Sequence, residues 1–125
     1  MTTVEEIKSQ LFPPGADIIS GFGGGYEDTC QNMVAAGVKW CIDNPDKAKA
    51  LSVKEYTNIY GICDVEGAYA KEFDGVLMEA CHNDCTGAMH QASVNHIFWV
   101  FSHSIEEYRA EVEKRVNSRG TTKTT

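Results

Sequence analysis

The sequence has no apolar run that approaches the roughly 20 residues of a membrane-spanning helix. The longest such run, from Ile97 to Phe101, is far shorter. The first residues, MTTVEEIKSQLF, have neither the basic start nor the apolar stretch of a signal peptide. We therefore expect no membrane association and a cytoplasmic location.

Basic residues are also scarce. The chain has 11 Lys and Arg against 18 Asp and Glu, which gives a formal net charge of −7. Such a surface repels a phosphate backbone, so direct nucleic-acid binding is not expected. Basic partners, including host proteins that themselves bind nucleic acid, would be attracted.

Nothing in the chain indicates a disulfide framework, a repeat or a long linker. The five cysteines are an odd number and are scattered, so we expect reduced thiols. The length of 125 residues, with 42% apolar and 23% charged residues, is typical of one globular domain. We predict a single domain over residues 1–117 and a disordered polar tail, 118–125, because the end reads SRGTTKTT.

Apolar residues recur at steps of three and four along most of the chain, which is the helical period. This predicts a mainly α fold, a compact bundle of about four main helices with room for one short strand pair. The main helices are expected at Tyr26–Asp43, Glu66–Cys81, Cys85–His103 and from Ser104 onward. Shorter elements are expected as a helix at Val4–Leu11, an extended segment at Ala16–Ser20 and a turn at Asp46–Leu51, and Tyr56–Cys63 fits either strand or helix.

The inner faces of these helices follow from the same periodicity. The predicted inward residues are Tyr26, Cys30, Met33, Val34, Gly37, Val38 and Cys41, then Tyr69, Phe73, Val76, Leu77 and Ala80, then Met89, Ser93, His96, Ile97, Val100 and Phe101, and finally Ile105, Tyr108, Val112 and Val116. The third helix is apolar on most sides, which indicates either a central position or a subunit interface. A homodimer or higher oligomer would explain it, with Trp40, Phe98 and Trp99 as an exposed apolar contact.

The stretch GFGGGYEDT, residues 21–29, places glycines directly before a helix start, as a phosphate-binding loop does. The known phosphate fingerprints are absent, since Tyr26 replaces a glycine and Glu27 and Asp28 replace a Lys-Ser/Thr pair. The two carboxylates would favour a cation, an amine or a hydroxyl. In the alternative, structural interpretation, the glycines only allow the turn and the acids only satisfy the helix N-terminus.

The stretch CHNDCTGAMHQ, residues 81–91, allows three functional interpretations. Sulfur and nitrogen donors could bind zinc, with Cys81, His82, Cys85 and His90 as weak candidates at a non-standard spacing. Cys85 could instead be a nucleophile at a helix N-terminus, with a histidine as base. Third, the helix start could hold a polar ligand. The structural alternative is that Asp84 caps the helix and the cysteines fill the core.

If the two glycine-opened helices start side by side, both stretches would line one pocket. The expected ligand-binding residues are then Gly23, Gly24, Gly25, Tyr26, Asp84, Thr86, Gly87, His90 and Gln91. No catalytic residue is predicted, and the sequence does not identify a cofactor. The partner would be a small polar ligand or a host protein.

An acidic stretch overlaps the second helix. Its acids are Asp64, Glu66, Glu72, Asp74, Glu79 and Asp84, against one base, Lys71. A solvated helix face is the ordinary interpretation of such a charge pattern. The alternative is a nucleic-acid mimic of the anti-CRISPR type that inhibits a DNA-binding protein.

GFGGGYEDTCQ and DCTGAMHQ together resemble small uncharacterised proteins of tailed phages and prophages, over most of residues 16–103. The resemblance implies an accessory function in the host cytoplasm, such as counter-defence, and brings no catalytic residues. Our leading hypothesis is a small non-enzymatic binding protein that holds a polar or nucleotide-like ligand. The alternatives are an acidic protein-binding inhibitor and a metal- or cysteine-dependent hydrolase.

Overall fold

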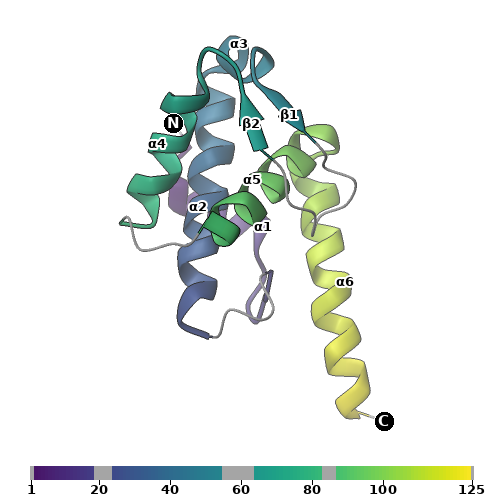
Figure 1. Cartoon of the computed structure of the whole chain (residues 1–125). Coiled ribbons are helices and arrows are strands. Elements are labelled where there is room, and N and C mark those ends of the chain that lie inside the picture. Colours follow the sequence, from purple (N-terminus) through teal and green to yellow (C-terminus); the bar gives the residue numbers. More distant parts are fainter. Residues whose placement is uncertain (1, 19–23, 55–63, 83–86, 125) are drawn as a thin grey trace.

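A computed structural model gives the fold (Figure 1). It describes residues 2–18, 24–54, 64–82 and 87–124, the last to residue 117 for side chains. The described elements are helices α1 (Val4–Leu11), α2 (Gly24–Asp43), α3 (Pro45–Lys49), α4 (Ala70–Ala80), α5 (Gly87–Ser102) and α6 (Ile105–Thr124), with strands β1 (Ser52–Lys54) and β2 (Asp64–Glu66). The prediction of a mainly helical, compact fold with a short strand pair is confirmed.

Helix α2 is the centre of the bundle, in contact with α1, α4 and α5 (Figure 1). Helix α6 packs against α1 and α5. The antiparallel pair β1–β2 matches Val53 with Val65 and lies against α5 through β2. None of the helices that the structure describes is long and apolar enough to cross a membrane.

Two capped helix starts explain where α1 and α6 begin. Thr3 and Glu6 form a complete capping box, in which the Thr3 hydroxyl accepts the Glu6 N–H at 3.1 Å. At α6 the Ser104 hydroxyl accepts the Glu107 N–H at 3.0 Å. The backbone of α6 continues to Thr124, and the disordered tail expected at 118–125 stays a prediction.

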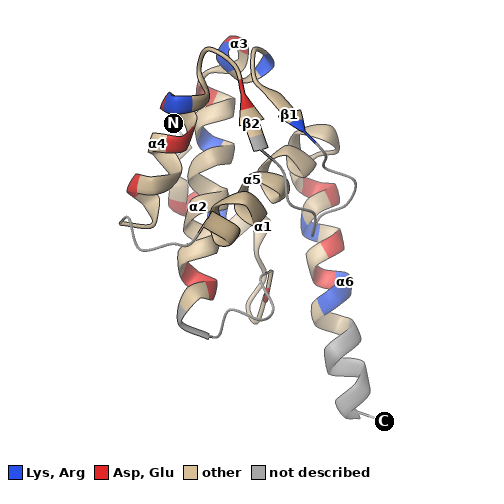
Figure 2. Cartoon of the chain, viewed as in Figure 1, with Lys and Arg blue, Asp and Glu red and all other residues tan. Residues whose placement is uncertain are grey.

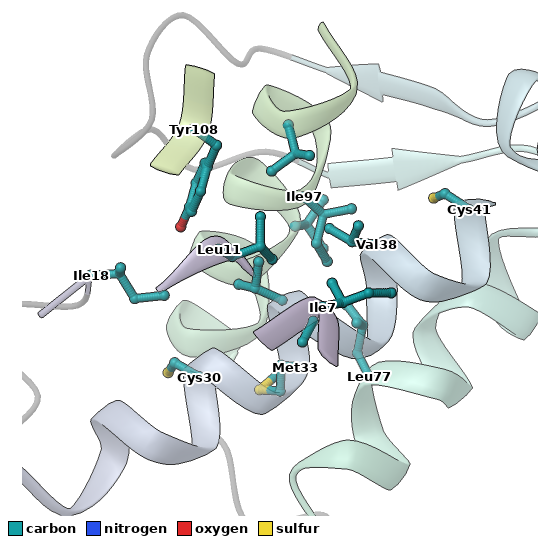
Figure 3. Packing of buried hydrophobic residues seen from close by; sticks show 14 of the residues in the cluster. Ile7, Leu11, Ile18, Cys30, Met33, Val38, Cys41, Leu77, Ile97 and Tyr108 are labelled. Atoms are coloured by element: carbon teal, nitrogen blue, oxygen red, sulfur yellow. The ribbon is translucent and has the colours of Figure 1, made fainter. Parts of the chain in front are cut away.

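The core draws side chains from α1, α2, α4, α5 and α6 to one place (Figure 3). The fully buried members with the largest side chains include Tyr108, Phe73, Ile7, Leu11, Met33, Leu77, Met89 and Ile97. Most of the predicted inward faces are therefore correct. Helix α5 carries no Asp, Glu, Lys or Arg (Figure 2), and it packs against α2, α6 and β2, which agrees with its all-round apolar pattern.

Three predicted inward residues are exposed instead. Tyr26, Tyr69 and Phe101 have exposed fractions of 42%, 37% and 44%. Tyr26 and Phe101 lie near the ends of α2 and α5, and Tyr69 directly precedes α4. Periodicity gives the direction of a side chain around the helix axis, but it does not say where along that axis the partner helix stops.

Trp40 is buried, although it was expected in an exposed apolar contact patch. Its indole is 8% exposed, packs against Phe73 at 5.4 Å between ring centroids, and donates its N–H to Glu72 Oε2 at 3.0 Å. Phe98 and Trp99 are half-buried against the core. The three residues therefore do not form an exposed patch.

The predicted start of the second main helix was also wrong. Glu66 is the last residue of β2 and pairs with Ser52. Gly67 follows with a φ of +124°, and a Cβ there would lie 2.7 Å from the Ala50 carbonyl oxygen. The turn that ends the strand pair needs this glycine, so the helix begins only at Ala70.

Candidate functional site

The glycine segment leads into α2, whose first acid is used within the protein. Both oxygens of Glu27 accept the Ile18 backbone N–H, at 2.9 and 3.0 Å. The Gln31 amide donates to Glu27 Oε2 at 2.7 Å and to the Ala16 carbonyl at 3.3 Å. The described part of the predicted extended segment, 16–18, is therefore no strand but a connection held to α2 by side chains.

The second acid of the same turn is paired as well. Asp28 Oδ1 lies 2.6 Å from the Lys8 ammonium of α1. These contacts support the structural interpretation of the two acids over a cation or amine site. Tyr26 is exposed, Gly24 and Gly25 are the first residues of α2, and Gly23 lies outside the described residues.

The start of α5 holds the other predicted ligand residues. His90 Nε2 lies 3.3 Å from Asp74 Oδ1, so this imidazole faces α4. Gly87 opens the helix at a point where an added Cβ would meet no atom within 4 Å, and Gln91 is half-buried. Asp84, Cys85 and Thr86 lie outside the described residues, so the helix cap and the nucleophile at Cys85 stay predictions.

Helices α2 and α5 run in the same general direction where they touch. Ser93 Oγ donates to Met33 Sδ at 3.8 Å, and one turn further along both helices Gly37 packs on Ile97. The order of the two contacts is the same on both helices, which favours the expected placement of both helix starts at one end. A pocket shared by the two starts remains a prediction, because 19–23 and 83–86 are not described.

The weak metal candidates Cys81 and His82 lie in different environments. Cys81 is 2% exposed, and its thiol donates to the Met78 carbonyl at 3.3 Å. His82 is exposed at the end of α4. Within the described residues, no three His, Cys, Asp or Glu side chains come together in an arrangement that could hold a metal ion.

His82 has a left-handed backbone, with φ at +54°, directly after the last turn of α4. Glycine prefers this helix-ending position because a Cβ is strained there. We expect His82→Gly to raise the free energy of unfolding by about 0.5–1 kcal/mol. Urea unfolding followed by circular dichroism measures this change. Loss of stability would show that the imidazole makes contacts that outweigh the backbone strain.

A polar groove lies at the junction of α1, the 13–16 turn, α2 and α6. Its volume is about 460 Å³, within the range of about 300–1,000 Å³ typical of small-molecule sites. The lining residues of this polar groove are Glu5, Lys8, Ser9, Phe12, Pro13, Pro14, Gly15, Ala16, Gln31 and Arg109.

Arg109 joins the end of α1 to α6. Its Nη1 donates to the Ser9 carbonyl at 2.9 Å and to the Gln10 carbonyl at 3.3 Å, and its Nε donates to Glu113 at 3.0 Å. These carbonyls lie at the negative end of the α1 dipole, where a cation is favourable. Among the described residues, no partner is recorded for Nη2, so one edge of the guanidinium keeps donors for a ligand.

The rest of the polar groove offers complementary groups. Gln31 uses Nε2 to donate its hydrogen bonds to Ala16 and Glu27. Within the described residues, its Oε1 accepts no recorded hydrogen bond. The Lys8 side chain is 20% exposed and is shared with Asp28. Phe12 and the two prolines add an apolar wall. The groove can therefore take a small ligand that combines an anionic group, a hydrogen-bond donor and an apolar ring.

Sequence reasoning missed this groove. None of its lining residues, including Arg109 and Gln31, was among the predicted ligand-binding residues. The only local sign of Arg109 is its helical spacing from Glu113. Nothing in the sequence shows that the first turns of α6 lie beside the end of α1, a hundred residues earlier in the chain.

Three of the six acids in the acidic stretch lie beside basic side chains. Lys54 pairs with Glu66 at 3.2 Å, Lys47 with Glu72 at 3.0 Å and His90 with Asp74 at 3.3 Å. The hydrogen bond from Lys47, and then that from Trp40, hold the pKa of Glu72 below its usual value. Figure 2 shows acidic and basic residues interspersed over the described part of the chain. This arrangement favours an ordinary solvated face over nucleic-acid mimicry.

The fold and the polar groove define a small helical protein with a candidate small-molecule site. Comparisons of the chain with protein-family models, with curated protein sequences and with solved structures gave no match.

Proposed function

We propose that this protein is a small non-enzymatic binding protein that holds a small anionic, nucleotide-like ligand in the polar groove. The observation that carries the proposal is the Arg109 guanidinium, which is fixed by two backbone carbonyls and Glu113 and still has donors to offer. A guanidinium fixed in advance loses little conformational entropy when it binds a carboxylate or phosphate.

The remaining lining residues support binding rather than catalysis. The described lining contains one carboxylate, Glu5, and neither a cysteine nor a histidine. The lining groups that could act as a base or nucleophile are Glu5, Lys8 and Ser9, and of these Lys8 is paired with Asp28. A role in sequestering a nucleotide signal, which the phage resemblance implies, would need binding alone.

The test is a titration of the purified protein with adenosine monophosphate and with inorganic phosphate, followed by isothermal calorimetry. Arg109→Lys keeps the positive charge but loses the planar set of donors. We expect it to weaken binding by about tenfold or more, because hydrogen bonds to charged groups contribute about 1.5–3 kcal/mol. Lys114→Ala, which removes an exposed base on the same helix, is the matched control and should bind as the parent does.

Three results would contradict the proposal. Absence of binding by both probes, or equal affinities of Arg109→Lys and the parent, would remove the polar groove as an anion site. If Tyr26→Ala and His90→Ala lose the ligand while Arg109→Lys retains it, the site lies instead at the two helix starts. Circular dichroism and melting temperature show whether each variant is folded.

A further inference from the structure

A second cavity is lined by residues from the end of α2, from α3 and β1, and from the end of α5. Its volume is about 410 Å³, again in the range of small-molecule sites. We call it the apolar groove. Its lining residues are Cys41, Pro45, Ala48, Lys49, Leu51, Val53, Phe98 and Phe101.

The walls of the apolar groove continue from the core to the surface. Cys41 and Leu51, at 2% and 9% exposed, lie at its inner side, and burial raises the pKa of the Cys41 thiol to about 12, so that it stays neutral. Phe101 leaves 44% of its surface in water at the outer side. An apolar ligand placed here would cover exposed aromatic surface and meet no buried charge.

Lys49 is the one charged residue in the described lining of this groove. The neighbouring lysines are already paired, Lys39 with Asp43, Lys47 with Glu72 and Lys54 with Glu66. Lys49 is exposed, and no acidic partner is recorded for it in the part of the chain that the structure describes. The groove thus combines a single available cation with otherwise apolar walls.

We propose that the apolar groove binds a linear alkyl carboxylate, with its chain along Leu51, Val53 and Phe101 and its carboxylate at the Lys49 ammonium. A ligand with one anionic end and an uncharged remainder matches the distribution of charge in the lining. A second copy of this chain fits less well, because two molecules of net charge −7 repel each other. The proposal is independent of the polar groove.

The first test is a calorimetric titration with octanoate, decanoate and dodecanoate below their micelle concentrations. Burial of each methylene should raise the affinity by about fourfold, so each two-carbon step should raise it by about 16-fold while the groove has room. Lys114→Ala, which changes neither groove, should bind decanoate as the parent does.

The second test separates the head group from the chain. Lys49→Glu should weaken decanoate binding by about fivefold to tenfold, because a partly exposed ion pair is replaced by a repulsion of similar size. Binding of decanol, which has the same chain and no charge, should change by less than about twofold. Lys114→Glu is the matched control for the change in net charge. Phe101→Ser should weaken the binding of both decanoate and decanol.

Several outcomes would overturn the proposal. One is an affinity that does not depend on the length of the alkyl chain. Another is an equal loss of decanoate affinity in Lys49→Glu and Lys114→Glu. A third is unchanged affinity of Phe101→Ser for both decanoate and decanol. Native mass spectrometry that shows a dimer broken by Phe101→Ser, with no bound decanoate in the parent, would assign the groove to a second copy instead.

Discussion

The free energy of unfolding is expected to fall by about 2–3 kcal/mol between about pH 7 and about pH 4.5 through the protonation of one side chain, His96. This imidazole is 1% exposed in the middle of α5. Its Nδ1 lies 2.9 Å from the Tyr108 hydroxyl, and the two rings meet edge to face at 5.8 Å. Burial, and then the charge of Arg115, lower its pKa from 6.5 to about 3.

The direction of this pH dependence follows from the protonation of His96 in the unfolded and folded states. In the unfolded chain His96 takes up a proton near pH 6.5, whereas in the folded protein it stays neutral until about pH 3. Between these values the unfolded state binds one more proton, so the stability falls as the pH falls. Above about pH 7 the imidazole is neutral in both states and this contribution does not vary.

Urea unfolding at a series of pH values measures the effect, and His96→Gln isolates it. The variant should have a smaller slope of stability against pH, lower by about 1.4 kcal/mol per pH unit at most between these two pKa values. Tyr108→Phe is the control, because it removes the hydroxyl but leaves the imidazole buried. It should lower the stability at every pH and keep the slope of the parent. Parallel curves for His96→Gln and the parent would contradict the prediction.

Gly37→Val is expected to lower the free energy of unfolding by about 2 kcal/mol. A Cβ at Gly37 would lie 2.2 Å from Ile97 Cδ1, 2.9 Å from Ile97 Cγ1 and 3.1 Å from Leu77 Cδ2. These side chains are fully buried, so Ile97 has little space into which to move. Overpacking costs about 1–3 kcal/mol, and the better helix propensity of valine recovers less than about 1 kcal/mol of it.

A double-mutant cycle with Ile97→Ala checks the cause. Ile97→Ala alone should lower stability by about 2–5 kcal/mol because it leaves a cavity. In the combined variant the valine fills part of that cavity, so the double variant should be more stable than the sum of the two by about 1–2 kcal/mol. Additive effects would show that α2 and α5 do not touch at this point. Gly75→Val, where a Cβ on α4 meets nothing within 4 Å, is the control for propensity alone.

Most of the secondary structure could be predicted, because the helical period and the turn residues act locally. Val4–Leu11 was predicted to the residue, and α2, α5 and α6 to within two residues of their starts. The error at Glu66 has a tertiary cause. Asp64–Glu66 is a strand because it pairs with Ser52–Lys54. No local pattern distinguishes Asp64–Glu66 from the first turn of a helix.

The candidate site could be predicted much less well. Residue types indicated that Glu27, Asp28 and His90 carry chemistry, and the structure gives each of them an internal partner in Ile18, Lys8 and Asp74 respectively. The sequence shows the same residue type whether a carboxylate contacts a ligand or accepts a backbone N–H. Which of the two occurs depends on which segment of the chain packs against that carboxylate.

By itself the sequence determined a helical, acidic chain with one helix that is apolar on most sides, because composition and periodicity are properties of the chain itself. Only the tertiary structure decided that Arg109 meets the end of α1, that Trp40 is buried on Glu72 and that Lys49 borders an apolar groove. These contacts join residues that lie far apart along the chain or on separate elements. Their geometry is fixed by how whole helices pack, which depends on the complete core rather than on any one segment.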